Sequence, residues 1–315
     1  MMLRFFAVRL LRALITIALV VTFAFIVLRV SGDPALEIMS VDAPPEAIAA
    51  FRKAWGLDAP LWIQYARYLL AILHGDLGQS MRDGREAVVV VAERIPATLE
   101  LTVPALLFSL AVGIPAGVYA ALQRNSRTDR AVMVAAIAGF TVPSFVFGLL
   151  LVLVFSIRLG WLPSGGIGGL GHCILPIVTL GVGGAAVLAR FARGAMLEVL
   201  GQPYIRAGSA RGLPWRRVIV SHALPNAAIP TLTIVGFMVG NLIAGAVLVE
   251  NVFSWPGLGR LLVVSVVSRD LAVVQCILLL IAAVMIGANV TVDLLYGVLD
   301  PRIRTAPLCA GAGRC

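Results

Sequence analysis

The sequence contains several long apolar stretches in which no side chain is charged. A helix needs roughly 20 apolar residues to span a bilayer, with a range of about 17–25. Most of these stretches reach that length, and the whole chain is 60% hydrophobic and only 13% charged. They predict an all-α membrane protein with six transmembrane helices. The stretches are Ala13–Leu28, Leu101–Gln123, Ala131–Ile157, Cys173–Ala189, Leu224–Val249 and Leu271–Val292.

Proline and glycine set the expected shape of two of these helices. The third helix is predicted over Asp129–Ile157, with a kink at Pro143. The fifth is predicted over Ile229–Val249, and its glycines permit close contact with neighbouring helices. These glycines are Gly236, Gly240 and Gly245.

The basic residues gather in alternate segments between the predicted helices. The segment between helices four and five has six arginines and one acid, whereas the segment from Val30 to Ile95 has six basic residues and nine acids. Loops rich in arginine and lysine face the cytoplasm. The pattern therefore predicts that both termini are cytoplasmic and that residues 31–94 lie outside. It also accounts for the net charge of +9 without a nucleic-acid partner.

Lysine is almost missing from the chain, since Lys53 in the outer segment is the only one among 25 basic residues. A P-loop needs a lysine on the nucleotide phosphates, so the chain is not its own P-loop ATPase. The H-E-x-x-H and G-x-S-x-G motifs are absent, and the four cysteines have neither disulfide nor metal-site spacing. We therefore predict a chain that is not an enzyme and has no catalytic residues, cofactor or resident metal.

The sequence has two further acidic residues of interest and predicts two short helices in the outer segment. Glu100, near the outer end of helix two, is interpreted as a solvated acid. For Asp293, in helix six, an ion or proton site and a structural acid both stay open. In the outer segment, short helices are predicted over Pro44–Trp55 and Pro60–Leu73.

The basic segment between helices four and five has the pattern of a helical hairpin. Pro203 is placed to start a short helix, and Gly212 is placed to end it. A second helix is expected over Trp215–Leu224, with Pro214 in its first turn and Pro225 after its end. Three interpretations are open: a basic loop held at the lipid headgroups, a phosphate-binding loop, and a docking knob for a cytoplasmic motor. Wrong glycine spacing and the missing lysine weigh against the second.

The hairpin also carries a family resemblance. Tyr204–Leu213, followed by His222–Pro230, resembles the coupling loop of ABC importer permeases, in particular those of the dipeptide/oligopeptide/nickel group. Gly208 and Pro225 depart from the family pattern, which affects the expected strength of coupling rather than the role. Other stretches match in order along nearly the whole chain. These are Gly32–Ala35, Gly56–Asp58, Gly75–Gly78, Arg94–Glu100, Val142–Phe145, Leu159–Pro163, Glu250–Gly259 and Leu299–Arg304.

The resemblance implies a type I ABC importer permease fold in a bacterial inner membrane. It implies a first transmembrane helix over 1–30, a periplasmic segment over 31–94, a transmembrane domain over 95–300 with its coupling loop at about 190–228, and a cytoplasmic tail over 301–315. Expected partners are a second permease subunit, two cytoplasmic ATP-binding subunits and a periplasmic solute-binding protein that faces Glu250–Gly259 and residues 31–94. The residues expected to couple to the ATPase are Tyr204, Ile205, Arg206, Gly208, Ser209, Ala210, Arg211, Gly212 and Leu213.

The cargo implied by the resemblance is a dipeptide or oligopeptide. Nickel or a glutathione-like compound is the alternative within the same architecture, and the adjacent His172 and Cys173 are conceivable nickel contacts. An ion-coupled secondary transporter is the alternative from another class. It would need a driving-ion site and usually an inverted repeat, and no repeat is evident.

Overall fold

The computed structural model describes residues 2–30, 32–39 and 43–299. The regular secondary structure of this part of the chain is helical, apart from one isolated antiparallel bridge between Gln79 and Glu86. The helices of the first third of the chain are α1 (Met2–Val30), α2 (Pro34–Met39), α3 (Pro45–Ala54), α4 (Leu61–Leu73), α5 (Ala87–Ala92) and α6 (Ile95–Leu122). Both helices expected in the outer segment are therefore present, as α3 and α4.

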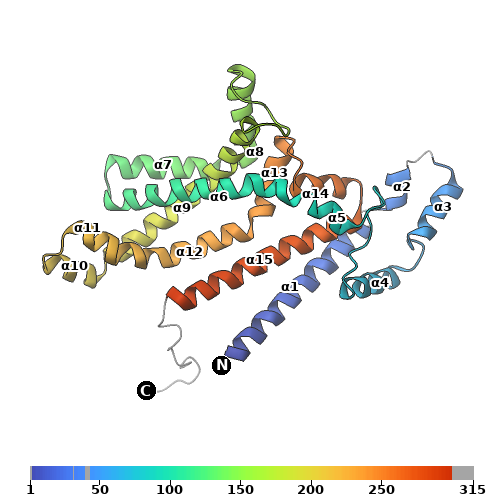
Figure 1. Cartoon of the computed structure of the whole chain (residues 1–315), viewed down its shortest axis with the longest axis horizontal. Coiled ribbons are helices and arrows are strands. Elements are labelled where there is room, and N and C mark those ends of the chain that lie inside the picture. The colour runs from blue at the N-terminus through green and yellow to red at the C-terminus, as the bar shows by residue number, and fades with distance from the viewer. Residues whose placement is uncertain (1, 31, 40–42, 300–315) are drawn as a thin grey trace. The chain divides into compact units, whose positions relative to one another are not determined.

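The rest of the described chain continues the helical pattern (Figure 1). Its helices are α7 (Arg127–Thr141), α8 (Ser144–Leu151), the π-helical turn Val152–Arg158, α9 (Gly171–Leu200), α10 (Pro203–Ala210), α11 (Trp215–Val218), the π-helical turn Ile219–Ala223, α12 (Leu224–Gly240), α13 (Leu242–Val252), α14 (Leu258–Val267) and α15 (Leu271–Leu299).

Four helical segments of the described chain are long and apolar enough to cross a membrane, or five if α7 and α8 count as one interrupted span. In α1, the apolar part Leu14–Val27 is shorter than these. The number of six spanning helices therefore stays a prediction, because it requires both α1 and the α7–α8 pair to cross the membrane. The four long segments are Ala87–Leu122, Gly171–Leu200, Trp215–Gly240 and Leu271–Val292.

The structure corrects two of the predicted helices. The third is not merely kinked at Pro143 but stops at Thr141 and restarts at Ser144. Proline has no N–H and disfavours helical geometry in the residue before it, and Val142 is extended with ψ 120°. The predicted fifth helix over Ile229–Val249 is likewise two helices, α12 and α13, separated at Asn241.

The hairpin's second helix also differs from its prediction. It does not end before Pro225, because Trp215–Gly240 is a continuous helical segment. The π-helical turn Ile219–Ala223 places Pro225 within the first two positions of α12. Proline has no N–H to donate, and the π-helical turn accommodates it because the regular i→i−4 hydrogen bonding is interrupted there. The α9 helix, in turn, extends beyond the predicted Cys173–Ala189 at both ends.

The chain forms two compact units, and each has its own apolar core. The first unit comprises Met1–Val103, Phe145–Pro176 and Ile243–Val284. Its core joins α5, α13, α14 and the beginning of α15. The buried residues of this core are Ala87, Val90, Val91, Ile243, Leu258, Val273, Cys276 and Ile277.

The second unit comprises Pro104–Ser144, Ile177–Leu242 and Met285–Cys315. Small residues set its packing, because a Cβ on Gly117 would lie 3.0 Å from the Cα of Ala189. Close helix packing of this kind is typical of membrane proteins. Gly236 and Gly240 permit the close helix contact expected from the sequence. Gly236 lies against Val292 of α15, and Gly240 lies against Met285 of the same helix. Gly245, in the first unit, does not, since no described atom would lie within 4 Å of its Cβ.

Candidate functional site

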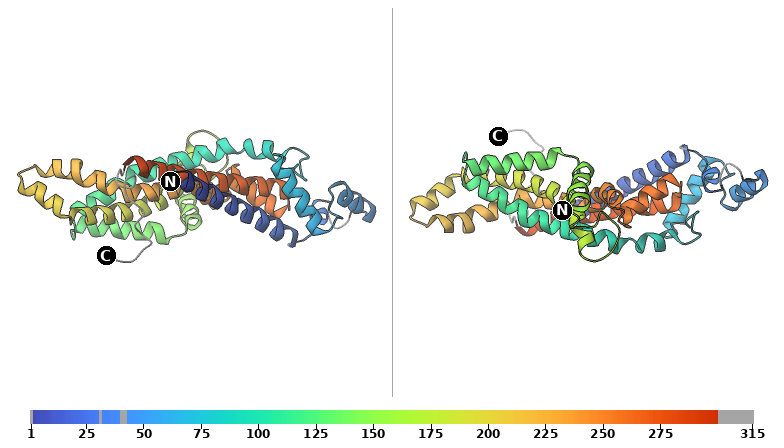
Figure 2. Two further views of the ribbon diagram at one scale, coloured as in Figure 1. Left: turned by 90° about the horizontal axis from the view of Figure 1, so that it is seen from below. Right: turned by 90° about the horizontal axis from the view of Figure 1, so that it is seen from above.

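The predicted hairpin is formed by α10 and α11 in the second unit. Gln202 precedes α10, and a proline occupies one of its first two positions, where the missing N–H costs no hydrogen bond. Gly212 follows with φ +75°, a left-handed conformation that glycine adopts without steric cost. Pro214 then stands immediately before α11. Figures 1 and 2 show the two helices as a hairpin at the ends of α9 and α12.

One face of the hairpin is fixed to the second unit by a buried apolar cluster. Ile205 on α10 is only 2% exposed, and Val218 on α11 is fully buried. They share a core cluster with Met196 on α9 and Ala223 of the π-helical turn, and Leu213 packs against this cluster from the loop. Because both helices are anchored to long helices, the hairpin is attached to the unit as a rigid part rather than as a free loop.

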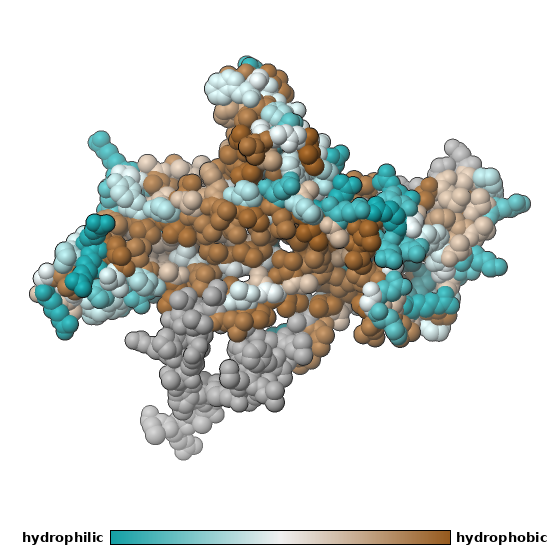
Figure 3. Space-filling model, in the orientation of Figure 1, coloured by the Kyte–Doolittle hydropathy of each residue, from teal (hydrophilic) through white to brown (hydrophobic). Residues whose placement is uncertain are grey.

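The other face of the hairpin is exposed and basic. Tyr204 is 45% exposed and Trp215 is 54% exposed. Between residues 203 and 217 there are four arginines and no acid, and all four arginines are exposed. In Figure 3 these polar residues appear as teal at the hairpin, next to the apolar helices of the same unit. The four arginines are Arg206, Arg211, Arg216 and Arg217.

The structure separates the nine predicted coupling residues into two groups. Ile205 is buried, and Leu213 and Gly208 are half-buried, so these three hold the hairpin together. The other six are exposed and can contact a partner: Tyr204, Arg206, Ser209, Ala210, Arg211 and Gly212. Burial follows from the side of the helix on which each residue lies, which the motif alone does not reveal.

A partly buried ion pair braces the second unit between α7 and α9. Arg193 donates from Nε to Oδ1 of Asp129 at 2.6 Å and from Nη2 to Oδ2 at 2.7 Å. Oδ2 also accepts the backbone N–H of Asn125, and Ser126 caps α7 by accepting from the N–H of Asp129. From the sequence Asp129 is only the first residue of the predicted third helix, whereas the structure makes it a fixed link to α9.

In the first unit, two motif stretches bind each other. Glu250 is fully buried and accepts a hydrogen bond from the Thr98 hydroxyl at 2.7 Å. The same hydroxyl accepts from the backbone N–H of Leu258 at 2.7 Å, and Trp255 donates from its indole to the carbonyl of Ala97 at 2.7 Å. Arg260 donates its backbone N–H to Glu250 at 3.0 Å. Residues 94–100 and 250–260 therefore form one hydrogen-bonded structure.

Two glycines of the second stretch are required by this arrangement. A Cβ on Gly257 would collide with the Glu250 carboxylate, and one on Gly259 would lie 3.0 Å from the backbone nitrogen of Val247. Such contacts are too close for a side chain, so Gly257 leaves room for the buried carboxylate and Gly259 lets α14 approach the backbone of α13 at Val247. The motif Glu250–Gly259 is thus explained by packing around one acid.

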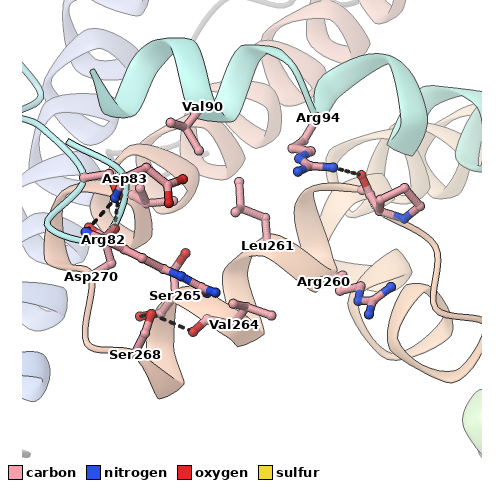
Figure 4. A pocket seen from close by; sticks show the side chains of 14 residues that line it. Arg82, Asp83, Val90, Arg94, Arg260, Leu261, Val264, Ser265, Ser268 and Asp270 are labelled. Carbon is pink, nitrogen blue, oxygen red and sulfur yellow. Dashed lines mark hydrogen bonds between the residues drawn. The ribbon is translucent and has the colours of Figure 1, made fainter. Parts of the chain in front are cut away.

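A pocket opens beside this structure, still within the first unit (Figure 4). Its volume is about 310 Å³. Ser80, Ser265 and Asp270 form a buried polar part, and the Ser80 hydroxyl donates to Oδ2 of Asp270. The remaining lining residues are Arg82, Asp83, Val90, Arg94, Pro256, Gly257, Arg260, Leu261, Val264, Ser268 and Val273.

Four other residues singled out from the sequence lie outside the hairpin and the pocket. Glu100 is exposed, as expected for a solvated acid. His172 and Cys173 lie in the first turn of α9 and are half-buried. Asp293 lies in α15, but its side chain is outside the described part of the chain, as are Asp300 and the tail 301–315.

Long apolar helices of this number are typical of a multi-pass membrane protein. Residues 113–305 match the model of the family described as the binding-protein-dependent transport system inner membrane component. Residues 2–102 match the model of the N-terminal part of such membrane components. The chain therefore belongs to the family of ABC permeases of binding-protein-dependent transport systems. Proteins of this family are transport subunits of the inner membrane that work with ATP-binding and substrate-binding components.

Curated relatives and a solved structure agree with this assignment. The glutathione transport system permease protein GsiC of Escherichia coli strain K12 is 40% identical over 304 residues, which cover 96% of this chain and 99% of the relative. GsiC of Salmonella typhi has the same identity and coverage. The inward-facing MetNI methionine ABC transporter covers 68% of this chain and 97% of its own chain, with a TM-score of 0.58 at 20% identity. That likeness shows the fold.

Proposed function

We propose that this chain is one half of the translocation pathway of an ATP-driven uptake system for small peptides, with glutathione among its cargoes. The α10–α11 hairpin transmits the motion of an ATP-binding subunit to the second unit. The observation that carries this proposal is the division of the hairpin into a buried face with Ile205 and Val218 and an exposed, basic face. A rigid-body movement of the partner would be passed on because the anchored face leaves the hairpin little freedom.

The proposal includes a membrane topology. Six spans are assigned to α1, α6, the α7–α8 pair, α9, α11–α12 and α15, with both termini in the cytoplasm. The excess of arginine on the hairpin and of acids in residues 31–94 supports this orientation. Residues 31–94 and the structure around Glu250 then face the periplasm, where a solute-binding protein would dock. Two ATP-binding subunits and a second permease subunit complete the assembly.

The cargo follows from the relatives, whose names state glutathione transport. Glutathione is itself a small peptide, so peptide and glutathione import are chemically one hypothesis. Nickel is the alternative within the same architecture. The chain itself has no part in ATP hydrolysis in this proposal, since a P-loop requires a lysine and only Lys53 is present, in the segment assigned to the periplasm.

Reconstitution of the complete complex in proteoliposomes tests the proposal. Uptake of reduced glutathione and trialanine is expected only when the ATP-binding subunits, ATP and the binding protein are all present. Uptake driven by a proton or sodium gradient without the ATP-binding subunits would contradict it in favour of a secondary transporter. Uptake of Ni²⁺ with neither peptide probe transported would favour the nickel alternative.

A pair of variants tests the hairpin in the same vesicles. Ser209→Trp puts a large side chain on the exposed face and is expected to abolish uptake without changing membrane insertion. Ser164→Trp is the control, because Ser164 is also exposed but lies outside the hairpin. Normal uptake by the Ser209 variant would refute docking at this face.

A further inference from the structure

The rim of the pocket in the first unit has three arginines, Arg82, Arg94 and Arg260, and one acid, Asp83, and its floor holds the buried Asp270. Arg82 lies in the loop before α5 and Arg94 at the start of α6, and both are exposed. Figure 4 shows the Arg82 side chain extending toward α14 and the Arg94 guanidinium near Pro256. Arg94 donates to the carbonyl of Pro256 at a long 3.4 Å, which leaves most of its N–H groups for another acceptor. Two guanidinium groups therefore offer donors to an anionic group.

Asp270 supplies the opposite chemistry. Its side chain is only 2% exposed, and Oδ2 accepts from the Ser80 hydroxyl. Its other oxygen, Oδ1, is buried and has no hydrogen-bond partner among the described residues. A buried acceptor without a partner is costly, because it has lost its water and gained nothing in return. An N–H donor on a bound molecule would give Oδ1 the hydrogen bond that it lacks, and a charged donor would form the strongest one.

The walls between these polar groups are apolar. Val90, Leu261, Val264 and Val273 line the pocket together with Pro256. Ligand sites for small molecules are clefts of about 300–1,000 Å³ with apolar walls and few polar groups. At about 310 Å³ this pocket is at the small end of that range, which suits a molecule with short side chains.

We propose that this pocket binds a small zwitterionic peptide, with its carboxylate at Arg82 and Arg94 and its ammonium group at Oδ1 of Asp270. The identification of the ligand class rests on the proposed import of peptides, whereas the charges on the two sides of the pocket come from the structure alone. Free termini of opposite charge match the basic rim and the acidic floor at once. An acidic surface loop of a binding protein would satisfy the arginines but would leave Oδ1 without a donor.

The pocket also touches the hydrogen-bonded structure around Glu250. Gly257, Arg260 and the carbonyl of Pro256 belong to both. A bound peptide would therefore contact the segment that Glu250 and Thr98 hold in place. The peptide would occupy this site after its release by a binding protein and before its passage through the pathway.

Direct binding to the complete complex without its binding protein tests the proposal. The probes are radiolabelled trialanine, N-acetyl-trialanine and trialanine amide, measured by equilibrium dialysis in nanodiscs. Blocking either terminus is expected to weaken binding about tenfold, which is typical for the loss of a charge-assisted hydrogen bond. If trialanine does not bind, or binds no better than the blocked probes, the proposal is wrong.

Two variants assign each terminus to its side of the pocket. Arg82→Gln is expected to reduce the preference for trialanine over its amide, with Arg94 still present, but to keep the preference over the acetylated probe. Asp270→Asn is expected to have the reverse effect. Arg85→Gln is the control, because Arg85 is an exposed arginine of the same loop that pairs with Glu93 and does not line the pocket. It should leave both preferences unchanged.

The outcomes separate this site from the proposed function. If Arg82→Gln changes neither preference but weakens attachment of the binding protein, the pocket is a docking surface and the proposal is overturned. Because Arg82 is exposed, its variant tests the site even if Asp270→Asn does not fold. Peptide binding that follows the expected pattern in a complex that transports no peptide would refute the proposed cargo and leave the site standing.

Discussion

Arg193 on α9 binds both carboxylate oxygens of Asp129 on α7, at 2.6 Å and 2.7 Å, in the second unit. Asp129 is only 3% exposed, so its charge depends on this partner. The Arg193 side chain is 25% exposed, so the loss of one member costs less than the roughly 3–5 kcal/mol of a fully buried pair. The pair therefore fixes α7 against α9 in the unit that also carries the hairpin.

Arg193→Gln is expected to destabilise the protein by about 1–2 kcal/mol, because Asp129 would lose two charge-assisted hydrogen bonds and keep its charge without its partner. The double variant Asp129→Asn with Arg193→Gln should cost less than the sum of the single variants, since neither charge is then left alone. Thermal unfolding in detergent measures all three. Additive losses would show that the two side chains do not act as a pair.

Ile205→Ala is expected to cost about 2–5 kcal/mol of stability and to uncouple ATP hydrolysis from uptake, because it removes buried contacts that anchor α10. Arg206→Ala, next to it on the exposed face, should leave stability unchanged. ATPase activity and uptake measured side by side give the coupling ratio. A stable and fully coupled Ile205→Ala complex would contradict the anchoring role.

Two glycines of the hairpin should respond to alanine in opposite directions. A Cβ on Gly208 would lie 3.8 Å from Val218 and 3.9 Å from Leu213, which is ordinary contact, so Gly208→Ala should stabilise the helix by about 0.5–1 kcal/mol. Gly212 has φ +75°, and alanine there should cost about 1 kcal/mol. The thermal midpoints of the two variants should therefore shift in opposite directions. A shift of equal sign would contradict the geometry described for this turn.

Glu250→Gln is expected to destabilise the first unit by about 1–3 kcal/mol, because the new amide group would present a donor to groups that already donate to Glu250. These groups are the Thr98 hydroxyl and the backbone N–H of Arg260. Glu100→Gln serves as the control, since Glu100 is exposed on the same part of the chain as Thr98. Thermal unfolding should distinguish the two variants. An equal and small effect of both would show that the buried carboxylate is not needed.

Much of the helical layout follows from the sequence because charge-free stretches and proline positions act locally. Pro203, Gly212 and Pro214 indicate the hairpin in this way, and the structure confirms it. The break at Asn241 has a weaker signal, namely one polar residue in an apolar run. Its side-chain amide donates to the carbonyl of Phe237, a local bond that competes with regular helix geometry.

The hydrogen bonds that form the structure around Glu250 and the floor of the pocket join residues that lie far apart in the sequence. Thr98 and Glu250 are 152 positions apart, and no pattern in the sequence pairs them. Ser80 and Asp270 are separated by 190 positions, so the acidic floor of the pocket is visible only after folding. The motif around the hairpin likewise does not reveal that Ile205 is directed inward. Local chemistry thus predicts the elements, whereas the tertiary packing decides which side chains meet.

In the proposed assembly an ATP-binding subunit grips the exposed face of the α10–α11 hairpin. Site-specific photo-cross-linking from position 209 in the assembled complex tests it most directly. Leu73 on α4 is the comparison position, because it is 81% exposed and lies in the segment assigned to the periplasm. The account predicts a cross-link to the ATP-binding subunit from 209 and none to it from 73. A cross-link from 209 to the solute-binding protein, with none to the ATP-binding subunit, would contradict it.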